Sequence, residues 1–327
     1  MKSWIMRRRS ETLTPQSFEL VDAAPPPPAA EDELRVRTDF ISLDPYLSRF
    51  MKTWVGDTPM WSEGHVNGRT VATVTESRAD GFAVGDRVLV TARWQAENTV
   101  SAAQAQKIAP DIDPPSLVLG ILGASGRTAW VGLHLADLKA GETLLVSAAT
   151  GPVGSVAGQL AKRRGLRVIG IAGGADKCRY AVDRLGFDAC LDHREPDLEG
   201  RLAMAAPAGV DVLFENIGQT GLDTGLSAIN EKGRILLCGL AQHYNDEAPM
   251  TLSHFRQLLY RQVRLQGFRT ADYLDLYPAA TAELLAGVKE GWLRYEEQVT
   301  DGLEHAASAY VAMLRGEGIG KRLIRLG

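Results

Sequence analysis

A short run of glycine and other small residues is the first feature of this sequence that could do chemistry. Residues 148–154 read Ala-Ala-Thr-Gly-Pro-Val-Gly, after the apolar segment Leu144–Ser147 and before an alanine-rich segment. Glycines in such a turn let the main chain approach a pyrophosphate, and the free N–H groups at the start of the following helix favour an anion. The order strand, glycine turn, helix, strand therefore predicts a dinucleotide site. Because the spacing A-x-x-G-x-x-G departs from G-x-G-x-x-G, a tight turn that merely needs small residues is the alternative.

The residues after the next predicted strand indicate which dinucleotide is bound. A site that selects NAD places a carboxylate near the end of this strand, where it accepts hydrogen bonds from the ribose 2′-hydroxyl. Here Arg167–Ala172 is followed by Gly-Gly-Ala-Asp-Lys, which puts Lys177 at the corner expected for the adenosine ribose. A cation with no carboxylate at the strand tip suits a 2′-phosphate, so the sequence favours NADPH. A solvated surface lysine is the alternative.

No set of residues is spaced like the ligands of a metal. Catalytic zinc takes three ligands of the Cys, His or acid type, and structural zinc usually takes four Cys or His. Residues 1–118 contain no cysteine, and their one histidine, His65, has no partners at such a spacing. We therefore expect no metal, and hydrogen-bond donors would have to polarise a substrate oxygen. A nucleophile elbow and a spaced Ser/His/Asp set are also missing from the sequence, so hydrolase chemistry has no support.

The composition is that of an ordinary soluble globular protein with two domains. The chain has 327 residues, of which 45% are hydrophobic and 23% charged, and it exceeds the usual size of a single core. The net charge of −4 gives no reason to expect nucleic acid or an anionic membrane as a partner. No apolar run approaches the ~20 residues that span a bilayer. Three cysteines fit a reducing cytoplasm, where we expect the protein.

Hydrophobic periodicity divides the chain into a β-rich part and an α/β part. In residues 1–118, segments 34–43, 70–75 and 86–91 alternate with a period of two, as half-buried strands do. From residue 119 to 289, strands and helices alternate in the pattern of a doubly wound parallel sheet. The predicted strands are Leu144–Ser147, Arg167–Ala172, Ala189–Leu191, Val210–Glu215, Arg234–Cys238 and Val263–Phe268. The predicted helices are Gly154–Arg164, Ala175–Leu185, Gly221–Ile229, Thr251–Tyr260 and 273–290. The remaining tail contains a predicted helix, Leu303–Arg315, and a last strand, Arg322–Leu326.

Several segments spread along the chain resemble one family of oxidoreductases. They are Ser42–Leu47 with Asp-Pro-Tyr at its centre, Gly85–Leu89, Leu122–Trp130, Ala148–Ser155, Ile171–Lys177, Phe214–Gly218, Gly233–Gly239 and Gly320–Lys321. In these segments the chain resembles the zinc-independent medium-chain dehydrogenases/reductases, in the group of prostaglandin (leukotriene) reductases, plant alkenal double-bond reductases and curcumin reductases. The combination of Asp-Pro-Tyr with Ala-Ala-x-Gly-x-Val-Gly-Ser is specific to this group.

The resemblance implies a fold, a reaction and a set of cofactor positions. The fold is a GroES-like β-rich domain (1–118), a Rossmann domain (119–289) and a C-terminal return to the first domain (290–327). The reaction is hydride transfer from NADPH to the β-carbon of an α,β-unsaturated ketone or aldehyde, and the assembly is a homodimer. The implied cofactor positions are Gly151, Pro152, Val153, Gly154, Lys177, Asn216, Cys238, Gly239, Tyr244, Phe268, Arg269 and Thr270.

Two residues depart from the family pattern. His193 stands where the family usually places a tyrosine near the 2′-phosphate. Since a histidine can hydrogen-bond to phosphate or stack on adenine, we still expect His193 to contact NADPH, with an affinity that depends on pH. Gly318 stands where an asparagine usually precedes Gly-Lys, so that side-chain contact is lost.

Charge flow in the implied reaction requires donors at the substrate oxygen. Hydride arriving at the β-carbon drives negative charge onto the carbonyl oxygen, and hydrogen-bond donors held there stabilise the enolate. The resemblance suggests Tyr244, in the segment Gln242–Asn245, as the catalytic donor. Tyr46 is a second candidate from the same pocket. Either ring could instead be an aromatic wall with its hydroxyl satisfied elsewhere.

Two other functions remain open at this point. A NADPH quinone oxidoreductase shares the fold and the lack of zinc, and a non-catalytic NADPH-binding protein would keep the glycine turn without turnover. The Asp-Pro-Tyr and Gln-His-Tyr-Asn segments favour the enone reductase. Trp54, Trp61 and Trp94 suggest an apolar pocket for a small hydrophobic enone or enal, although packing in the first domain explains them as well.

Overall fold

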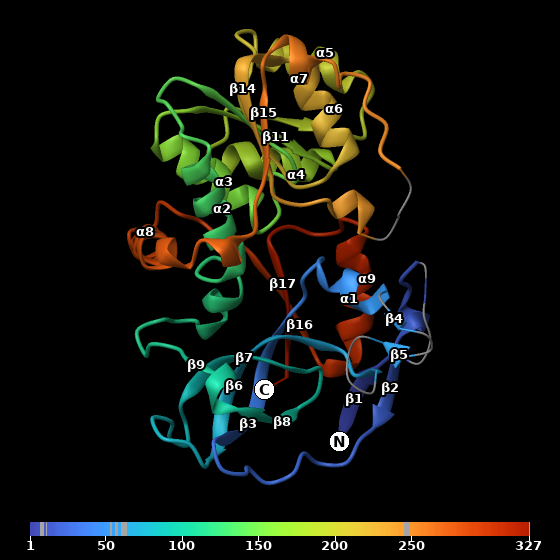
Figure 1. Ribbon diagram of the computed structural model, residues 1–327, viewed down its shortest axis with the longest axis vertical. Helices are drawn as coiled ribbons and strands as arrows, with labels where there is room; N and C mark the ends of the chain where they lie inside the picture. The colour runs from blue at the N-terminus through green and yellow to red at the C-terminus, as the bar shows by residue number, and fades with distance from the viewer. Residues whose placement is uncertain are drawn as a thin grey trace. The chain divides into compact units, whose positions relative to one another are not determined.

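The chain forms two compact units (Figure 1). The computed structural model describes residues 1–6, 10, 12–52, 54–55, 58–59, 64–244 and 249–326. Unit 1 contains residues 1–119, 244–246 and 297–327. Unit 2 contains residues 120–243 and 247–296. Unit 1 is thus built from both ends of the chain.

Unit 2 contains a parallel sheet whose strands lie in the order β12-β11-β10-β13-β14-β15. The strands are β10 (Thr143–Val146), β11 (Arg167–Ala172), β12 (Ala189–Asp192), β13 (Val210–Glu215), β14 (Ile229–Leu237) and β15 (Arg264–Gly267). Counted along the chain this is the order 3-2-1-4-5-6, so the predicted Rossmann sheet is confirmed. The order reverses between β10 and β13. In such sheets ligands bind beyond the carboxyl ends of the strands at this switch point.

Helices pack on the unit 2 sheet, and its central strands β10 and β11 are accordingly buried, mainly apolar runs. The helices are α2 (Ala124–Leu135), α3 (Gly154–Arg163), α4 (Ala175–Asp183), α5 (Leu198–Ala205), α6 (Gln219–Ser227), α7 (Gln257–Tyr260) and α8 (Tyr277–Lys289). Helix α2 packs against α3 and α8, whereas α5 and α7 both pack against α6. One buried cluster joins Leu145 and Leu213 of the sheet to Leu202 of α5 and Leu222 of α6. None of the described helices is long and apolar enough to cross a bilayer.

The structure corrects the predicted helices of unit 2 in three places. The predicted helix 251–260 is reduced to α7, α5 was not predicted, and Ile229 begins β14 instead of ending a helix. Side chains of α6 bind the start of the segment 251–260. The N–H of Thr251 donates to Gln219 Oε1 at 2.9 Å, and that of His254 donates to an Asp223 carboxylate oxygen at 2.8 Å. These bonds tie the start of the segment to α6, and the helix begins only at Gln257.

Unit 1 is built on a mainly antiparallel sheet in the order β16-β17-β3-β6-β7-β9, with β8 also paired to β3. Its strands are β3 (Glu33–Ser42), β6 (Asn67–Ser77), β7 (Arg87–Arg93), β8 (Glu97–Ser101), β9 (Gln106–Lys107), β16 (Glu297–Asp301) and β17 (Lys321–Arg325). Two strand pairs, β1 (Lys2–Ile5) with β2 (Glu19–Asp22) and β4 (Trp54–Val55) with β5 (Thr58–Pro59), and two helices, α1 (Leu47–Lys52) and α9 (Ala306–Leu314), complete the unit. Because β17 pairs with β3, the end of the chain shares a sheet with the first third.

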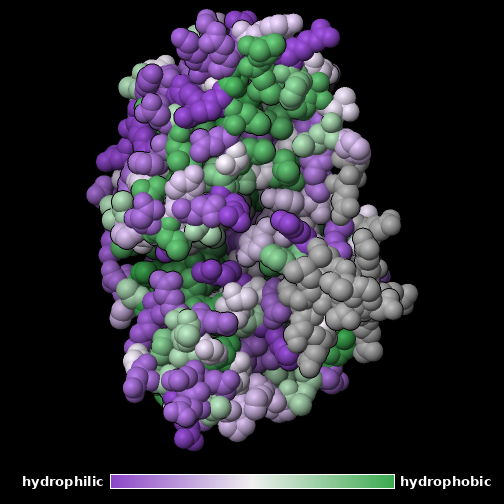
Figure 2. Space-filling model, viewed as in Figure 1, coloured by the Kyte–Doolittle hydropathy of each residue, from purple (hydrophilic) through white to green (hydrophobic). Residues whose placement is uncertain are grey.

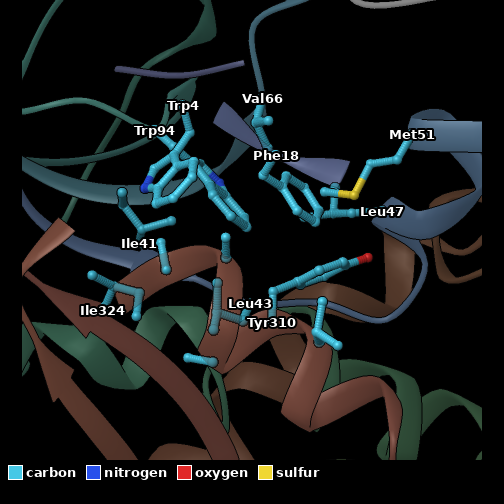
Figure 3. Close-up of a cluster of buried hydrophobic side chains, with 14 of the residues drawn as sticks. Trp4, Phe18, Ile41, Leu43, Leu47, Met51, Val66, Trp94, Tyr310 and Ile324 are labelled. Atoms are coloured by element: carbon cyan, nitrogen blue, oxygen red, sulfur yellow. The ribbon is translucent and has the colours of Figure 1, made fainter. Parts of the chain in front are cut away.

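One of the buried hydrophobic clusters of unit 1 is built around aromatic rings (Figure 3). The ring of Tyr310, from α9, meets the rings of Trp94 and Phe18 edge to face, with centroids 5.8 and 6.1 Å apart. Phe18 in turn meets Trp4 of β1 in the same way at 6.5 Å. The cluster therefore joins both ends of the chain, and α9 packs onto the β-rich part through it.

Trp94 belongs to this core, so it does not line a substrate pocket. A Cβ at Gly68 would lie 2.7 Å from its indole nitrogen, which shows how closely the neighbouring strand approaches. Trp61 lies outside the described residues, and so does the side chain of Trp54.

Candidate functional site

The glycine turn between β10 and α3 brings the start of a helix against the end of a strand. The N–H of Gly151 donates to the carbonyl oxygen of Ala148 at 2.9 Å. A Cβ at Gly154 would lie 2.4 Å from the same oxygen, so only glycine permits this approach. Ala148 itself has φ +48°, in the left-handed region that usually favours glycine. No side chain of the N-cap residue Val153 caps α3. Uncapped N–H groups at the start of a helix favour an anion.

Two hydrogen bonds connect the ends of β10 and β13 at the switch point. The main-chain N–H of Asn216 donates to Ser147 Oγ at 2.7 Å, and its side-chain amide donates to the Ser147 carbonyl oxygen at 2.8 Å. Both residues are buried. Asn216 was a predicted cofactor position. Because Ser147 directly precedes the predicted phosphate turn, these bonds place Asn216 beside that turn.

Glu215, a fully buried carboxyl group, organises the loop that follows β13. Its Oε1 accepts the N–H groups of Ile217 at 2.5 Å and Gly218 at 2.7 Å. Its Oε2 has no hydrogen-bond partner among the described residues. Burial raises the pKa of the Glu215 carboxyl to about 7, although the two N–H groups oppose the shift. The sequence reasoning missed this residue, and the signal that could have found it is an acid at the end of an apolar strand.

Glu215 also holds the first residues after β14. Its main-chain carbonyl accepts the N–H groups of Cys238 at 2.8 Å and Gly239 at 3.2 Å. These are two of the predicted cofactor positions. Burial, and then the nearby Glu215 carboxylate, raise the pKa of the Cys238 thiol to about 12. The thiol therefore stays protonated at neutral pH, which gives no support for a nucleophilic role.

The loop that continues from Gly239 is fastened to the start of α6. Gln242 Oε1 accepts the N–H of Thr220, and His243 Nε2 accepts the N–H of Gln219, both at 3.3 Å. Two residues of the Gln-His-Tyr-Asn segment thus cap α6 and position the loop. Asn245 lies outside the described residues.

Lys177 and His193 come to the same corner of unit 2. Lys177 lies half-buried in the first turn of α4, directly after β11, and His193 follows the neighbouring strand β12. A Cβ at Gly173 would lie 2.8 Å from His193 Nε2, so the imidazole packs against the end of β11. The pairing of β11 with β12 thus brings together two residues that the sequence separates.

The three predicted positions after β15 have different surroundings. The half-buried Phe268 ring meets the Phe214 ring edge to face, with centroids 6.4 Å apart. Arg269 is exposed and forms two hydrogen bonds, at 3.0 and 2.8 Å, with Asp272 of the same turn. Thr270 begins a short 3₁₀ helix, Thr270–Asp272.

In unit 1, the Asp-Pro-Tyr segment rests on a buried ion pair. Lys321 Nζ donates to a carboxylate oxygen of Asp44 and to the carbonyl oxygen of Leu43, and both charged side chains are almost fully buried. Ser42 Oγ donates to the other oxygen of the Asp44 carboxylate. The pair joins the first residue of β17 to the residues just before Tyr46.

Both predicted catalytic tyrosines belong to unit 1. Burial, and then the Asp44 charge, raise the pKa of Tyr46 to about 12, so its hydroxyl remains a hydrogen-bond donor at neutral pH. Its ring meets Phe50 edge to face and is 42% exposed. The carbonyl oxygen of Tyr244 accepts the Ser48 hydroxyl at 3.2 Å. Since Ser48 lies two residues after Tyr46, this hydrogen bond holds the two tyrosine segments side by side.

Gly318, where the family pattern has an asparagine, is confined by its neighbours. It has φ +82°, and a Cβ there would lie 1.9 Å from Gln298 Oε1. An asparagine at this position would require Gln298 of β16 to move.

One group of potential metal ligands occurs among the described residues. Glu199, Asp223 and His254 lie close enough to share a cation. His254 Nε2 is 3.1 Å from Glu199 Oε2, and Asp223 accepts the His254 N–H. These contacts account for the grouping, so it gives no reason to assign a metal. His65, considered in the sequence, instead forms a 3.2 Å hydrogen bond with Ser3.

Comparisons with known proteins cover the whole chain. The family described as "N-terminal domain of oxidoreductase" matches residues 2–108, and that described as "zinc-binding dehydrogenase" matches residues 152–286. The chain is 38% identical to the NADPH-dependent curcumin reductase of Escherichia coli, over 99% of this chain and 96% of that protein. It is 35% identical to the NADP(+)-dependent 2-alkenal reductase of Nicotiana tabacum, over 91% and 88% of the two chains. The crystal structure of CurA from Vibrio vulnificus in complex with NADPH is similar with a TM-score of 0.92 and 34% identity, over 100% of this chain and 99% of that one.

The buried Glu215 carboxyl predicts a stability that falls as the pH rises. Its pKa of about 7 in the folded chain lies above its ordinary value of 4.5, so the folded chain keeps a proton that the unfolded chain releases. The free energy of unfolding should then decrease by up to about 3 kcal/mol between about pH 4.5 and 8. The Glu215→Gln variant lacks this titration. Thermal unfolding of both proteins across this range should show the variant gaining stability relative to the wild type as the pH rises, and a constant difference would contradict the assignment.

Proposed function

Since the chain belongs to the medium-chain dehydrogenase/reductase family, in the group of NADP-dependent curcumin, prostaglandin and alkenal reductases, we propose that it reduces the carbon–carbon double bond of α,β-unsaturated ketones and aldehydes. The observation that carries the proposal is the glycine turn at the switch point. A Cβ at Gly154 would collide with the Ala148 oxygen, so the turn is built to bring main-chain N–H groups to an anion. Such a turn fits the pyrophosphate of NADPH.

Residues around the switch point would hold the cofactor. Gly151–Gly154 would bind the pyrophosphate, and Lys177 and His193 the 2′-phosphate end. Asn216 and the loop from Cys238 to Tyr244 would follow the ribose and nicotinamide. This assignment of the loop is supported by its hydrogen bonds: the Glu215 carbonyl holds the start of the loop, and Gln242 and His243 bind the start of α6. Phe268–Thr270 would complete the wall of the cofactor site.

When bound, NADPH would supply the hydride for the β-carbon of the substrate, and water would supply the proton that the α-carbon of the resulting enolate takes up. As negative charge develops on the carbonyl oxygen, Tyr244 would donate a hydrogen bond to it and stabilise the enolate. Tyr46 would be a second donor or a wall of the pocket. Its pKa of about 12 keeps the hydroxyl protonated at neutral pH, as a donor must be. The Ser48 hydrogen bond to the Tyr244 carbonyl would fix the main chain that carries the first donor.

A substrate panel tests this function. The purified protein with NADPH should consume cofactor on conjugated enones and enals of varied size, with a preference for small hydrophobic ones. The matching saturated ketones and aldehydes, which lack the double bond, are the controls. Preferred reduction of quinones would instead indicate a quinone oxidoreductase. Binding of NADPH without turnover on any of these compounds would indicate a non-catalytic protein.

The Tyr244→Phe variant tests the catalytic donor. Removing one donor to a developing oxyanion costs on the order of 10²-fold in kcat. We therefore expect kcat to fall by about this factor, while the Kd for NADPH stays within about twofold because the ring is kept. Tyr46→Phe is the matched comparison and should have the smaller effect. A Tyr244→Phe enzyme with unchanged kcat would remove this residue from the mechanism.

We also propose a homodimer, in the cytoplasm, formed through the outer edge of the unit 2 sheet. Strand β15 is at that edge, and large apolar side chains around it are exposed. They are Phe255, Leu259, Tyr260, Leu265 and Leu274. Figure 2 shows hydrophobic surface gathered where Figure 1 labels α6 and α7. Apolar patches of this kind usually mark protein interfaces, and an open strand edge can pair with a second chain.

Light scattering tests the homodimer. The wild type should have twice the mass of one chain. The Leu259→Glu variant, changed at a side chain that is 77% exposed, should shift towards the monomer. Val84→Glu is the matched control, since Val84 is 69% exposed but belongs to unit 1. A wild type with the mass of one chain would refute the proposal.

A further inference from the structure

The guanidinium group of Arg194 lies over the end of β11. Arg194 follows β12 and is exposed. A Cβ at Gly173 would lie 3.3 Å from its Nε and 3.4 Å from its Nη2, and a Cβ at Gly174 would lie 3.3 Å from its Nη1. All three guanidinium nitrogens thus approach the two glycines that precede Lys177 in the sequence. Side chains larger than hydrogen at residues 173 and 174 would crowd the arginine.

The carboxylate of Asp192 fixes the main chain that carries this arginine. Its Oδ1 accepts the N–H of Gly174 at 2.8 Å and that of Arg194 at 3.0 Å. One carboxylate oxygen therefore ties the end of β11 to the residues after β12. Partial burial works to raise the pKa of Asp192, but these N–H groups and the charges of His193 and Arg194 lower it below its usual value. Asp192 therefore remains ionised at neutral pH and keeps both bonds.

The other acidic side chains of this corner are engaged by other arginines. Asp176 forms an ion pair with Arg179 on the exposed side of α4. Glu195 forms an ion pair with Arg201 at 3.2 Å. In contrast, the Arg194 guanidinium takes part in no salt bridge within the part of the chain that the structure describes. Apart from the nearby Asp192 charge, no described carboxylate of this corner engages the Arg194 guanidinium.

We propose that Arg194 binds the 2′-phosphate of NADPH together with Lys177 and so determines the preference for NADPH over NADH. This inference rests on the proposed function, whose cofactor site it completes. A guanidinium offers planar, paired N–H donors that match two oxygens of a phosphate, which a lysine cannot do. In this chain His193 replaces the tyrosine that the family usually places near the 2′-phosphate. Arg194 would provide the second cationic contact with the phosphate, beside Lys177. Its own site is preformed, because the Asp192 carboxylate holds its main chain in place.

Equilibrium binding to Arg194→Ala tests this assignment. A hydrogen bond to a charged group corresponds to a factor of about ten or more in affinity. The Kd for NADPH, measured by nucleotide fluorescence, should therefore rise about tenfold or more, while the Kd for NADH stays within about twofold. Arg194→Lys should lie between the wild type and Arg194→Ala, since it keeps the charge but loses the planar donors. Lys177→Ala should likewise raise the Kd for NADPH and leave the Kd for NADH nearly unchanged.

Arg179→Ala is the matched control. It removes an exposed arginine from α4 whose partner is Asp176, so both affinities should remain unchanged. The proposal is overturned if Arg194→Ala resembles Arg179→Ala, or if it weakens NADPH and NADH equally, because equal losses indicate damage to the loop. Binding is measured without substrate. A wild type that binds NADPH selectively but reduces no enone would therefore contradict the proposed function without affecting the assignment of Arg194.

Discussion

The close approach of α3 to the end of β10 is the constraint on which unit 2 depends. A Cβ at residue 154 would lie 2.4 Å from the Ala148 carbonyl oxygen, so any residue except glycine would move the helix away from the strand. The first N–H groups of α3 would then no longer face the space beyond the switch point. The left-handed Ala148 is part of the same geometry and costs roughly 1–2 kcal/mol in a residue with a Cβ. The fold thus carries local strain where the cofactor would bind.

Two carboxyl groups, one at the end of β12 and one at the end of β13, organise the loops around this turn. Glu215 accepts N–H groups of the loop after β13, and Asp192 accepts N–H groups from both sides of the β11–β12 corner. Their environments shift their pKa values in opposite directions. Burial dominates at Glu215 and raises its pKa, whereas N–H donors and cations outweigh burial at Asp192 and lower its pKa. Both acids thus hold main chain in place around the proposed cofactor site.

The sequence predicted the fold well where local patterns decide the structure. Five of the six predicted strands of unit 2 overlap β10–β13 and β15 closely, and β14 starts earlier than predicted because Ile229 pairs with Val210. The predicted helix 251–260 was too long, since only Gln257–Tyr260 is helical and the residues before it bond to α6 side chains. Glu215 could have been noticed as an acid at the end of an apolar strand, although its pKa depends on burial in the folded chain. The role of Arg194 could not be predicted, since it depends on strands that meet only in the folded chain. The assignments of Tyr244 and Tyr46 remain predictions.

The most direct test of the account is the destination of the hydride. A single turnover with NADPH that carries deuterium at the transferable position, on a simple enone, would be followed by NMR of the product. If the hydride goes to the conjugated double bond, the product is a saturated ketone with deuterium on the former β-carbon. Deuterium on the carbonyl carbon, in an unsaturated alcohol, would contradict the proposed function, because the protein would then reduce carbonyl groups and not conjugated double bonds.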